Sequence, residues 1–122
     1  MTNPTPSTPT YDVESAIRVI GGKWKVLIVW HLKDDVLRYG TLRRLMPNIT
    51  EKMLIQQLRE LEADCIVKRT NYQTVPPRVE YTLSDHGRSI LPVLGALCEW
   101  GRLHVQHEQT MTTSANRASN DV

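Results

Sequence analysis

Polar side chains with hydrogen-bonding groups recur between Thr50 and Arg59 of this 122-residue chain. At about 100° per residue of a helix, Lys52, Gln56 and Arg59 share the face opposite a stripe of leucines. Glutamine amides can pair with adenine edges, whereas lysine and arginine favour guanine or phosphate. Such a helix is suited to the major groove of duplex DNA. The alternative is that this polar face is only solvated.

Further basic residues lie on both sides of this segment. Arg43 and Arg44 precede it, and Lys68, Arg69 and Arg78 lie on two extended runs that follow it. About six phosphate contacts per subunit would make binding strongly dependent on salt. The residues predicted to read bases are Lys52, Met53, Gln56 and Gln57. Those predicted to hold phosphates are Thr50, Arg43, Arg44, Lys68 and Arg78, and Arg59 is suited to either contact.

Other reactive residues do not form a catalytic or metal-binding pattern. Cys65 and Cys98 are too far apart in sequence to suggest a disulfide framework. His104 and His107 lie near Cys98, but they fall at the fraying end of a predicted helix with no second cysteine nearby, which disfavours zinc. Nucleophile motifs, glycine-rich phosphate loops and metalloprotease patterns are missing from the sequence. We therefore expect no enzyme activity, cofactor or metal.

Composition bounds the fold and the compartment. The formal net charge is +2, so the arrangement of charges matters more than their sum. The sequence has no apolar run of about 20 residues and no basic-then-apolar leader, which predicts a cytoplasmic protein with reduced thiols and no membrane association. Residues 1–10 and 110–122 are polar, and we expect a flexible arm and a flexible tail there. The folded domain is then 11–109.

Five helices, a short strand and a hairpin account for this domain. We expect helices over 12–20, with Asp12 as N-cap, and over 23–33 and 39–46, then one capped by Thr50, and a short strand over 36–38. Two strands, 66–72 and 78–83, flank a protruding loop that holds Pro76 and Pro77. Ser84 should cap a last helix over 85–107, bent at Pro92.

The order of these elements predicts a mainly α fold with a small β-hairpin wing. Short helices joined by a tight turn and followed by a β-ribbon are typical of a winged helix-turn-helix. Winged helices also serve as protein-interaction modules without DNA binding, so the fold leaves both functions open. The second alternative predicts no duplex affinity tighter than about 10⁻⁴ M at physiological salt.

Three ordered motifs carry a family resemblance. They are Gly-Gly-Lys-Trp at 21–24, Leu-Arg-Tyr-Gly at 37–40 and Pro-Pro-Arg-Val-Glu-Tyr at 76–81, within a match from about 13 to 101. The chain thereby resembles the HxlR family of bacterial winged-helix regulators. The resemblance implies a homodimer formed through the first and last helices, a recognition helix that begins at Thr50, and a wing at 73–77. It also implies repression or activation from an inverted-repeat operator, with half-sites about 10 bp apart or slightly more.

The chain departs from this family at a sensing position. Many members carry a cysteine where this chain has Tyr11, and a phenol cannot perform thiolate chemistry. Cys65 stands where the family more often has glycine after a helix, which indicates a left-handed C′ residue. Cys98 is expected to be a buried, inert thiol on the dimer helix. Redox activity of Cys65 or Cys98 is the alternative, and DNA affinity unaffected by diamide or a quinone would exclude it.

A small-molecule effector is a further candidate partner. An apolar pocket between the dimer helices and the central helix could accept one, and the alternative is a closed core. The residues predicted to line it are Trp24, Trp30, Leu94, Cys98 and Trp100.

Overall fold

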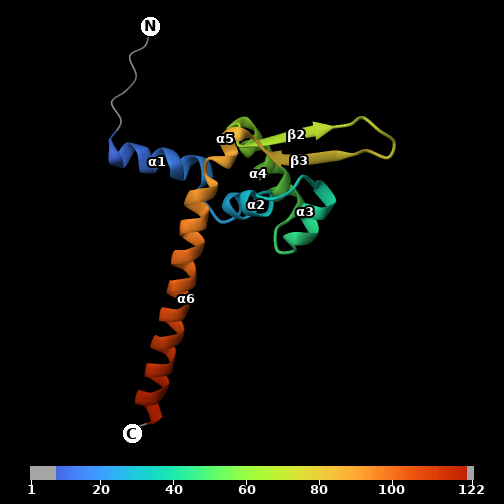
Figure 1. The fold of residues 1–122 in the computed structure, drawn as a ribbon. Coiled ribbons are helices and arrows are strands. Elements are labelled where there is room, and N and C mark those ends of the chain that lie inside the picture. Colours follow the sequence, from blue (N-terminus) through green and yellow to red (C-terminus); the bar gives the residue numbers. More distant parts are fainter. Residues whose placement is uncertain (1–7, 121–122) are drawn as a thin grey trace. The chain divides into compact units, whose positions relative to one another are not determined.

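A computed structural model describes residues 8–120 of the chain, so residues 1–7 of the expected arm and 121–122 of the expected tail lie outside it. The described chain divides into two compact units between Ser89 and Ile90, which we consider separately. The first unit holds the helix-turn-helix and the hairpin, and the second is a single long helix (Figure 1).

The first unit follows the expected order of elements. It comprises α1 (Pro9–Ile20), α2 (Lys25–His31), β1 (Leu37–Arg38), α3 (Tyr39–Leu45), α4 (Glu51–Ala63), β2 (Val67–Asn71), β3 (Val79–Leu83) and α5 (Asp85–Arg88). The strands form one antiparallel sheet in the order β1-β3-β2. The loop between β2 and β3 projects away from the helices (Figure 1). The expected winged helix-turn-helix is therefore confirmed.

The core of this unit is formed by α2, α3, α4 and the base of the sheet. Leu54, Leu58 and Leu61 of α4 are buried, which confirms the predicted stripe, and they join Ile28 of α2 and Leu42 of α3. Truncating one such leucine to alanine typically costs about 2–5 kcal/mol, since the cavity left behind closes only partly. The core thus fixes which face of α4 remains in solvent.

Two hydroxyl caps start helices where the sequence places them. The Thr50 Oγ1 accepts a hydrogen bond from the Met53 N–H at 3.1 Å, at the start of α4. The Ser84 Oγ accepts from the Gly87 N–H at 2.8 Å and donates to the Cys65 carbonyl at 2.5 Å. A side chain at position 87 would collide with the Ile66 carbonyl, so this junction between the sheet and α5 requires glycine.

The residue that joins the end of α4 to the start of β2 has the left-handed backbone conformation, as expected. Cys65 has φ 60°. Its N–H bonds to the Glu62 carbonyl and the Ile66 N–H bonds to the Leu61 carbonyl, which is the Schellman pattern that closes a helix. This position favours glycine because a β-carbon is strained there.

The first helix begins earlier than predicted. Its N-cap is Thr8, whose hydroxyl accepts from the Tyr11 N–H at 3.2 Å, and Pro9 takes the first helical position. Proline suits that position because its missing N–H would have no intrahelical partner. Asp12 lies inside the first turn instead of capping it, and residues 9–10 of the expected arm are helical.

The last helix predicted is in fact two. The short α5 ends at Arg88, and α6 (Leu91–Asn120) begins after two turn residues. A proline ring clashes with the carbonyl four residues before it, so Pro92 is incompatible with a helix that continues through Arg88. In α6 Pro92 occupies the first turn, where its missing N–H costs nothing. The chain therefore breaks before Pro92, rather than bending at it.

The second unit, α6, continues well beyond the predicted end near residue 107. Residues 110–120, predicted as part of a flexible tail, are helical. No glycine or proline follows Gly101 in the sequence, and the hydroxyls of Thr110 and Thr113 donate to carbonyls one turn earlier. The exposed side chains on this helix include Val93, Leu97, Trp100 and Leu103. Among residues 8–120, no helix is long and apolar enough to cross a membrane.

Cys65 provides a test of this fold. Cys65→Gly should raise the free energy of unfolding by about 0.5–1 kcal/mol, because glycine adopts positive φ without strain although it gains entropy in the unfolded chain. Urea denaturation checks this, and Cys65→Ala is the matched control because it keeps the β-carbon. Equal stability of the glycine and alanine variants would contradict the left-handed assignment.

Candidate nucleic-acid interface

The solvent face of α4 carries the predicted base-reading residues. Because Leu54 and Leu58 point into the core, Lys52, Gln56 and Arg59 are exposed on the opposite face. Met53 is 36% exposed, and Gln57 is half-buried at the edge of the same surface. Hydrogen-bond donors and acceptors therefore line the N-terminal half of α4, as a helix entering a major groove requires.

A network behind this face anchors α4 to α2. The buried Lys25 ammonium lies 2.7 Å from the Glu60 carboxylate. The Gln56 and Gln57 side-chain amides also donate to Glu60, at 3.5 Å and 3.4 Å. The hydrogen bond from Lys25, followed by that from Gln56, holds the pKa of Glu60 below its ordinary value. Two predicted base readers thus share one anchored acceptor.

The turn between α3 and α4 is held by Arg43. Its Nη1 donates to the Ile49 carbonyl at 2.5 Å, and the side chain is partly buried. Arg44, by contrast, is exposed and donates to the Thr41 hydroxyl at 3.3 Å. The two neighbouring arginines, both predicted as phosphate contacts, therefore differ: Arg43 braces the helix-turn-helix and Arg44 faces solvent.

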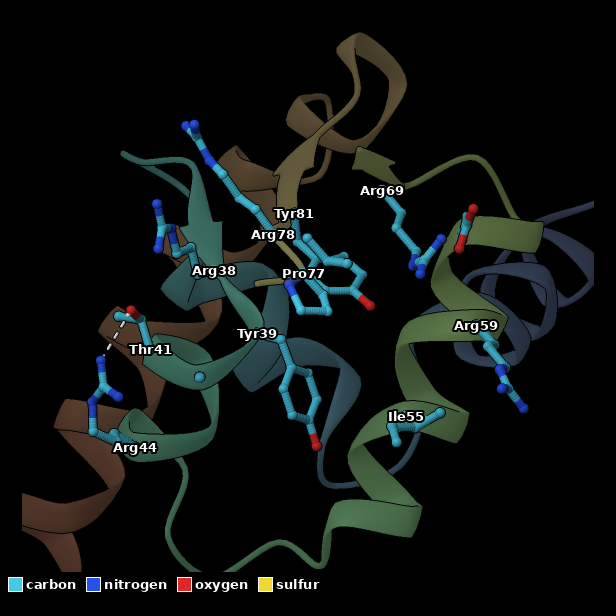
Figure 2. Close-up of a pocket in the computed structure, with 13 residues that line it drawn as sticks. Arg38, Tyr39, Thr41, Arg44, Ile55, Arg59, Arg69, Pro77, Arg78 and Tyr81 are labelled. Carbon is cyan, nitrogen blue, oxygen red and sulfur yellow. Dashed lines mark hydrogen bonds between the residues drawn. The ribbon is translucent and has the colours of Figure 1, made fainter. Parts of the chain in front are cut away.

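An open cavity of about 830 Å³ lies beside α4, with α3 and the sheet as its other walls. We call it the arginine cavity. Figure 2 shows Arg38, Arg44 and Arg78 on one side of it and Arg59 and Arg69 on the other. Its remaining lining residues are Tyr39, Gly40, Thr41, Ile55, Glu62, Pro77, Val79 and Tyr81. The lining thus contains five arginines and one carboxylate, that of Glu62.

One of these arginines is neutralised at the base of the wing. The Arg78 Nε and Nη2 donate to the same Glu80 oxygen at 2.9 Å and 2.7 Å, and its guanidinium lies 4.3 Å from the Tyr72 ring centre. Tyr72 in turn donates its hydroxyl to Glu80 at 3.0 Å. The hydrogen bond from Arg78 holds the pKa of Glu80 below its ordinary value. This cluster stiffens the hairpin below its loop.

Tyr39 lies between α3 and α4 in the same cavity (Figure 2). Its hydroxyl is closed off from solvent and has no hydrogen-bonding partner among the described residues. Burial, followed by the nearby Glu51 carboxylate, raises the pKa of Tyr39 above its ordinary value.

Strand alternation separates the two basic residues of β2. Neighbouring side chains of a strand point to opposite faces, and Arg69 shares its face with the buried Val67. Arg69 therefore lines the arginine cavity, whereas the exposed Lys68 lies on the other face and does not. Arg38 lines the cavity too, although the sequence marked it only as part of a strand. The alternation with Val67 was the signal that favours Arg69 over Lys68.

The predicted effector and redox residues lie elsewhere. Trp24 and Trp30 belong to the first unit, and Leu94, Cys98 and Trp100 to the second. None of them lines the arginine cavity, and neither does Cys65. Both thiols are exposed on the single chain. The expectation of a buried Cys98 is therefore wrong for the single chain, because the face of α6 that carries this thiol is uncovered in it.

Known proteins share this fold. Residues 19–109 match the HxlR-like helix-turn-helix family. The HTH-type transcriptional regulator YtcD of Bacillus subtilis is 56% identical over 94 residues, covering 77% of this chain and 75% of YtcD. The YtcD crystal structure gives a TM-score of 0.74 at 54% identity, over 77% of this chain and 96% of that one. The structure of the redox regulator HypR in its reduced form gives a TM-score of 0.77 at 44% identity, over 81% of this chain and 98% of that one.

The Lys25–Glu60 pair predicts a dependence of stability on pH. Because the pKa of Glu60 is lowered by folding, the carboxylate's stabilisation is present above its ordinary value of 4.5 and is lost as pH falls through the lowered value. The urea midpoint of wild type should therefore exceed that of Glu60→Gln by a constant amount between about pH 6 and 8, and the gap should narrow below about 4.5.

A matched control is Glu14→Gln, which removes an exposed carboxylate of α1 whose side chain makes no ion pair or hydrogen bond within residues 8–120. It should change the midpoint little. A gap between wild type and Glu60→Gln that is absent at neutral pH, or that widens in acid, would contradict the pairing with Lys25.

Proposed function

This chain belongs to the HxlR-like helix-turn-helix family of transcriptional regulators, and we propose that it acts in the cytoplasm by binding double-stranded DNA as a sequence-specific homodimer. The observation that carries this proposal is the exposed face of α4, whose polar side chains stand beside the arginine cavity. Base-reading and backbone-holding groups then lie on one side of the first unit.

Base recognition is assigned to the N-terminal half of α4. Lys52 and Gln56 are exposed there, and Met53 can contact a thymine methyl group. Gln57 reaches the edge of the same surface. Thr50 starts the helix, where backbone N–H groups and the helix dipole favour a phosphate. Phosphate contacts are assigned to Arg44, Arg59 and Lys68, which are exposed.

Dimerisation is supported by exposed apolar faces on two helices. Tyr11, Val13 and Ile17 of α1 are each more than half exposed, although a large apolar side chain is ordinarily covered. On α6, Leu97 and Trp100 are 52% and 62% exposed, one turn apart on one face. A second copy of the chain would cover these faces. A two-fold dimer of this kind reads an inverted repeat with half-sites about 10 bp apart.

Two substitutions separate base reading from backbone contact. Operators are first selected from a random duplex pool with the wild-type chain. Gln56→Ala should then weaken operator binding by about 1–3 kcal/mol and relax one base preference. Lys68→Ala should weaken all sequences alike and lower the salt slope of log K by about 1, because it removes a phosphate contact. If both variants bind the operator like wild type, the assignment of these residues is wrong.

The dimer is tested by a charge on α6. Leu97→Glu should reduce the mass in solution from about twice 14.0 kDa to a single chain and weaken operator binding by about 10²-fold, because two half-sites are no longer held together. The control variant Gln106→Glu adds the same charge on the opposite face of α6, nine residues later. It should remain dimeric and bind the operator like wild type. A Leu97→Glu variant that remains dimeric would contradict this interface.

A further inference from the structure

The Tyr81 hydroxyl is a feature of the arginine cavity that the proposed function does not use. Tyr81 is only 7% exposed, and within residues 8–120 its hydroxyl neither donates nor accepts a hydrogen bond. Buried polar groups ordinarily have a partner, because an unsatisfied one costs free energy. Tyr81 lines the cavity, and Figure 2 shows its hydroxyl directed toward the space between the sheet and α4. A hydrogen-bond donor therefore faces a cavity that a ligand can enter.

Arg69 lies beside this hydroxyl because of the strand register. Arg69 of β2 is paired with Tyr81 of β3. Directly opposed residues on one face of an antiparallel pair have β-carbons about 5 Å apart. The next pair on this face, Val67 and Leu83, is buried in the core. The register thus places one guanidinium and one phenol next to each other, just outside the core.

The arginines nearer the wing are less available to a ligand. Arg78 donates to Glu80 at 2.9 Å and 2.7 Å, and Arg38 acts electrostatically on the same carboxylate. A guanidinium near a carboxylate has less to gain from a second anion. Arg69 makes no ion pair or hydrogen bond within the part of the chain that the structure describes, and this includes Glu62 of the cavity lining. Arg69 is therefore the arginine best placed to hold an anion beside Tyr81.

A carboxylate matches this pair of donors. The guanidinium fork binds both oxygens of a carboxylate in two parallel hydrogen bonds, and it keeps its charge at any physiological pH. Each carboxylate oxygen has a second lone pair, so one of them can also accept a hydrogen bond from the Tyr81 hydroxyl. The carboxylate would then satisfy both Arg69 and Tyr81.

The apolar part of the lining determines the body of the ligand. Tyr39 of α3 and Ile55 of α4 are half-buried, and Pro77 lies between them and the wing (Figure 2). A flat ring can stack on such surfaces, and a volume of about 830 Å³ is in the range of small-molecule sites. We propose that the arginine cavity binds a small aromatic carboxylate, with its charged group on Arg69 and Tyr81. Its ring packs against Tyr39, Ile55 and Pro77.

A ligand bound in this way lowers the affinity for DNA. Arg59, which the proposed function assigns to phosphate, lines the same cavity. A bound carboxylate places a negative charge beside Arg59, and this charge repels a DNA phosphate. The effect on DNA rests on the proposed function, whereas binding of the ligand does not. The site also differs from the effector pocket expected among the tryptophans, none of which lines this cavity.

Calorimetric titration of sodium benzoate into the full chain tests the site without DNA. Wild type should bind benzoate with a dissociation constant below about 1 mM. Tyr81→Phe keeps the ring and removes the hydroxyl, so it should weaken binding at least about 10-fold, and Arg69→Gln should weaken it further. Tyr11→Phe is the matched control, because Tyr11 is an exposed tyrosine outside the cavity, and it should bind like wild type. Benzamide, which has the same shape without the charge, should bind at least about 10-fold more weakly than benzoate.

A second arm measures the effect on DNA. With benzoate at about ten times its dissociation constant, the operator affinity of wild type should fall about 10-fold relative to the same concentration of sodium chloride, as for mutually exclusive ligands. Tyr81→Phe should bind the operator like wild type without benzoate, since Tyr81 has no assigned DNA contact, and it should lose less affinity when benzoate is added.

Each arm has a result that overturns its part of the proposal. Wild-type binding of benzoate weaker than about 1 mM would overturn the site. So would equal binding in wild type, Tyr81→Phe and Arg69→Gln, with circular dichroism showing the variants folded. Equal affinities for benzoate and benzamide would overturn the assignment to a carboxylate. Benzoate that binds but leaves operator affinity unchanged would overturn the effect on DNA. Failure of wild type to bind any operator would overturn the proposed function and leave the calorimetric result in place.

Discussion

The burial of one leucine stripe is the constraint on which the rest of this structure depends. Leu54, Leu58 and Leu61 are held in the core of the first unit, so the rotation of α4 about its own axis is determined. Losing any one of them costs roughly as much as several surface hydrogen bonds provide. Every polar residue on the opposite face is therefore presented to solvent in a defined direction. Lys25 adds to this by tying Glu60 of the same helix to α2.

The elements on either side of α4 must also be held in place, and short polar contacts hold them. Arg43 closes the turn before α4, and the Schellman motif at Cys65 closes the helix after it. The Arg78–Glu80–Tyr72 cluster then stiffens the hairpin. Surface ion pairs of this kind contribute little to overall stability. Their effect is on geometry, because they hold the wing and the helix-turn-helix on either side of one cavity.

Much of this could be predicted from the sequence, because local chemistry determines it. The hydroxyl of Thr50, the leucine spacing of α4, the paired prolines of the hairpin loop and the C′ position of Cys65 each specify a local conformation without reference to distant residues. The ends of the chain were less predictable. Polar residues at 110–120 have the composition of a tail, yet without glycine or proline they continue a helix that has already been nucleated. The arginine cavity was missed because Arg38, Arg59 and Arg69 belong to three elements, and only the tertiary fold brings them together.

We propose that α4 and the residues beside it together bind a specific duplex. The most direct test is the ratio of dissociation constants for the selected operator and a scrambled duplex of equal length, measured by fluorescence anisotropy with the wild-type chain at physiological salt. The operator should bind at least about 10³-fold more tightly. Equal affinities for the two duplexes, or no binding tighter than about 10⁻⁴ M to either, would contradict this proposal.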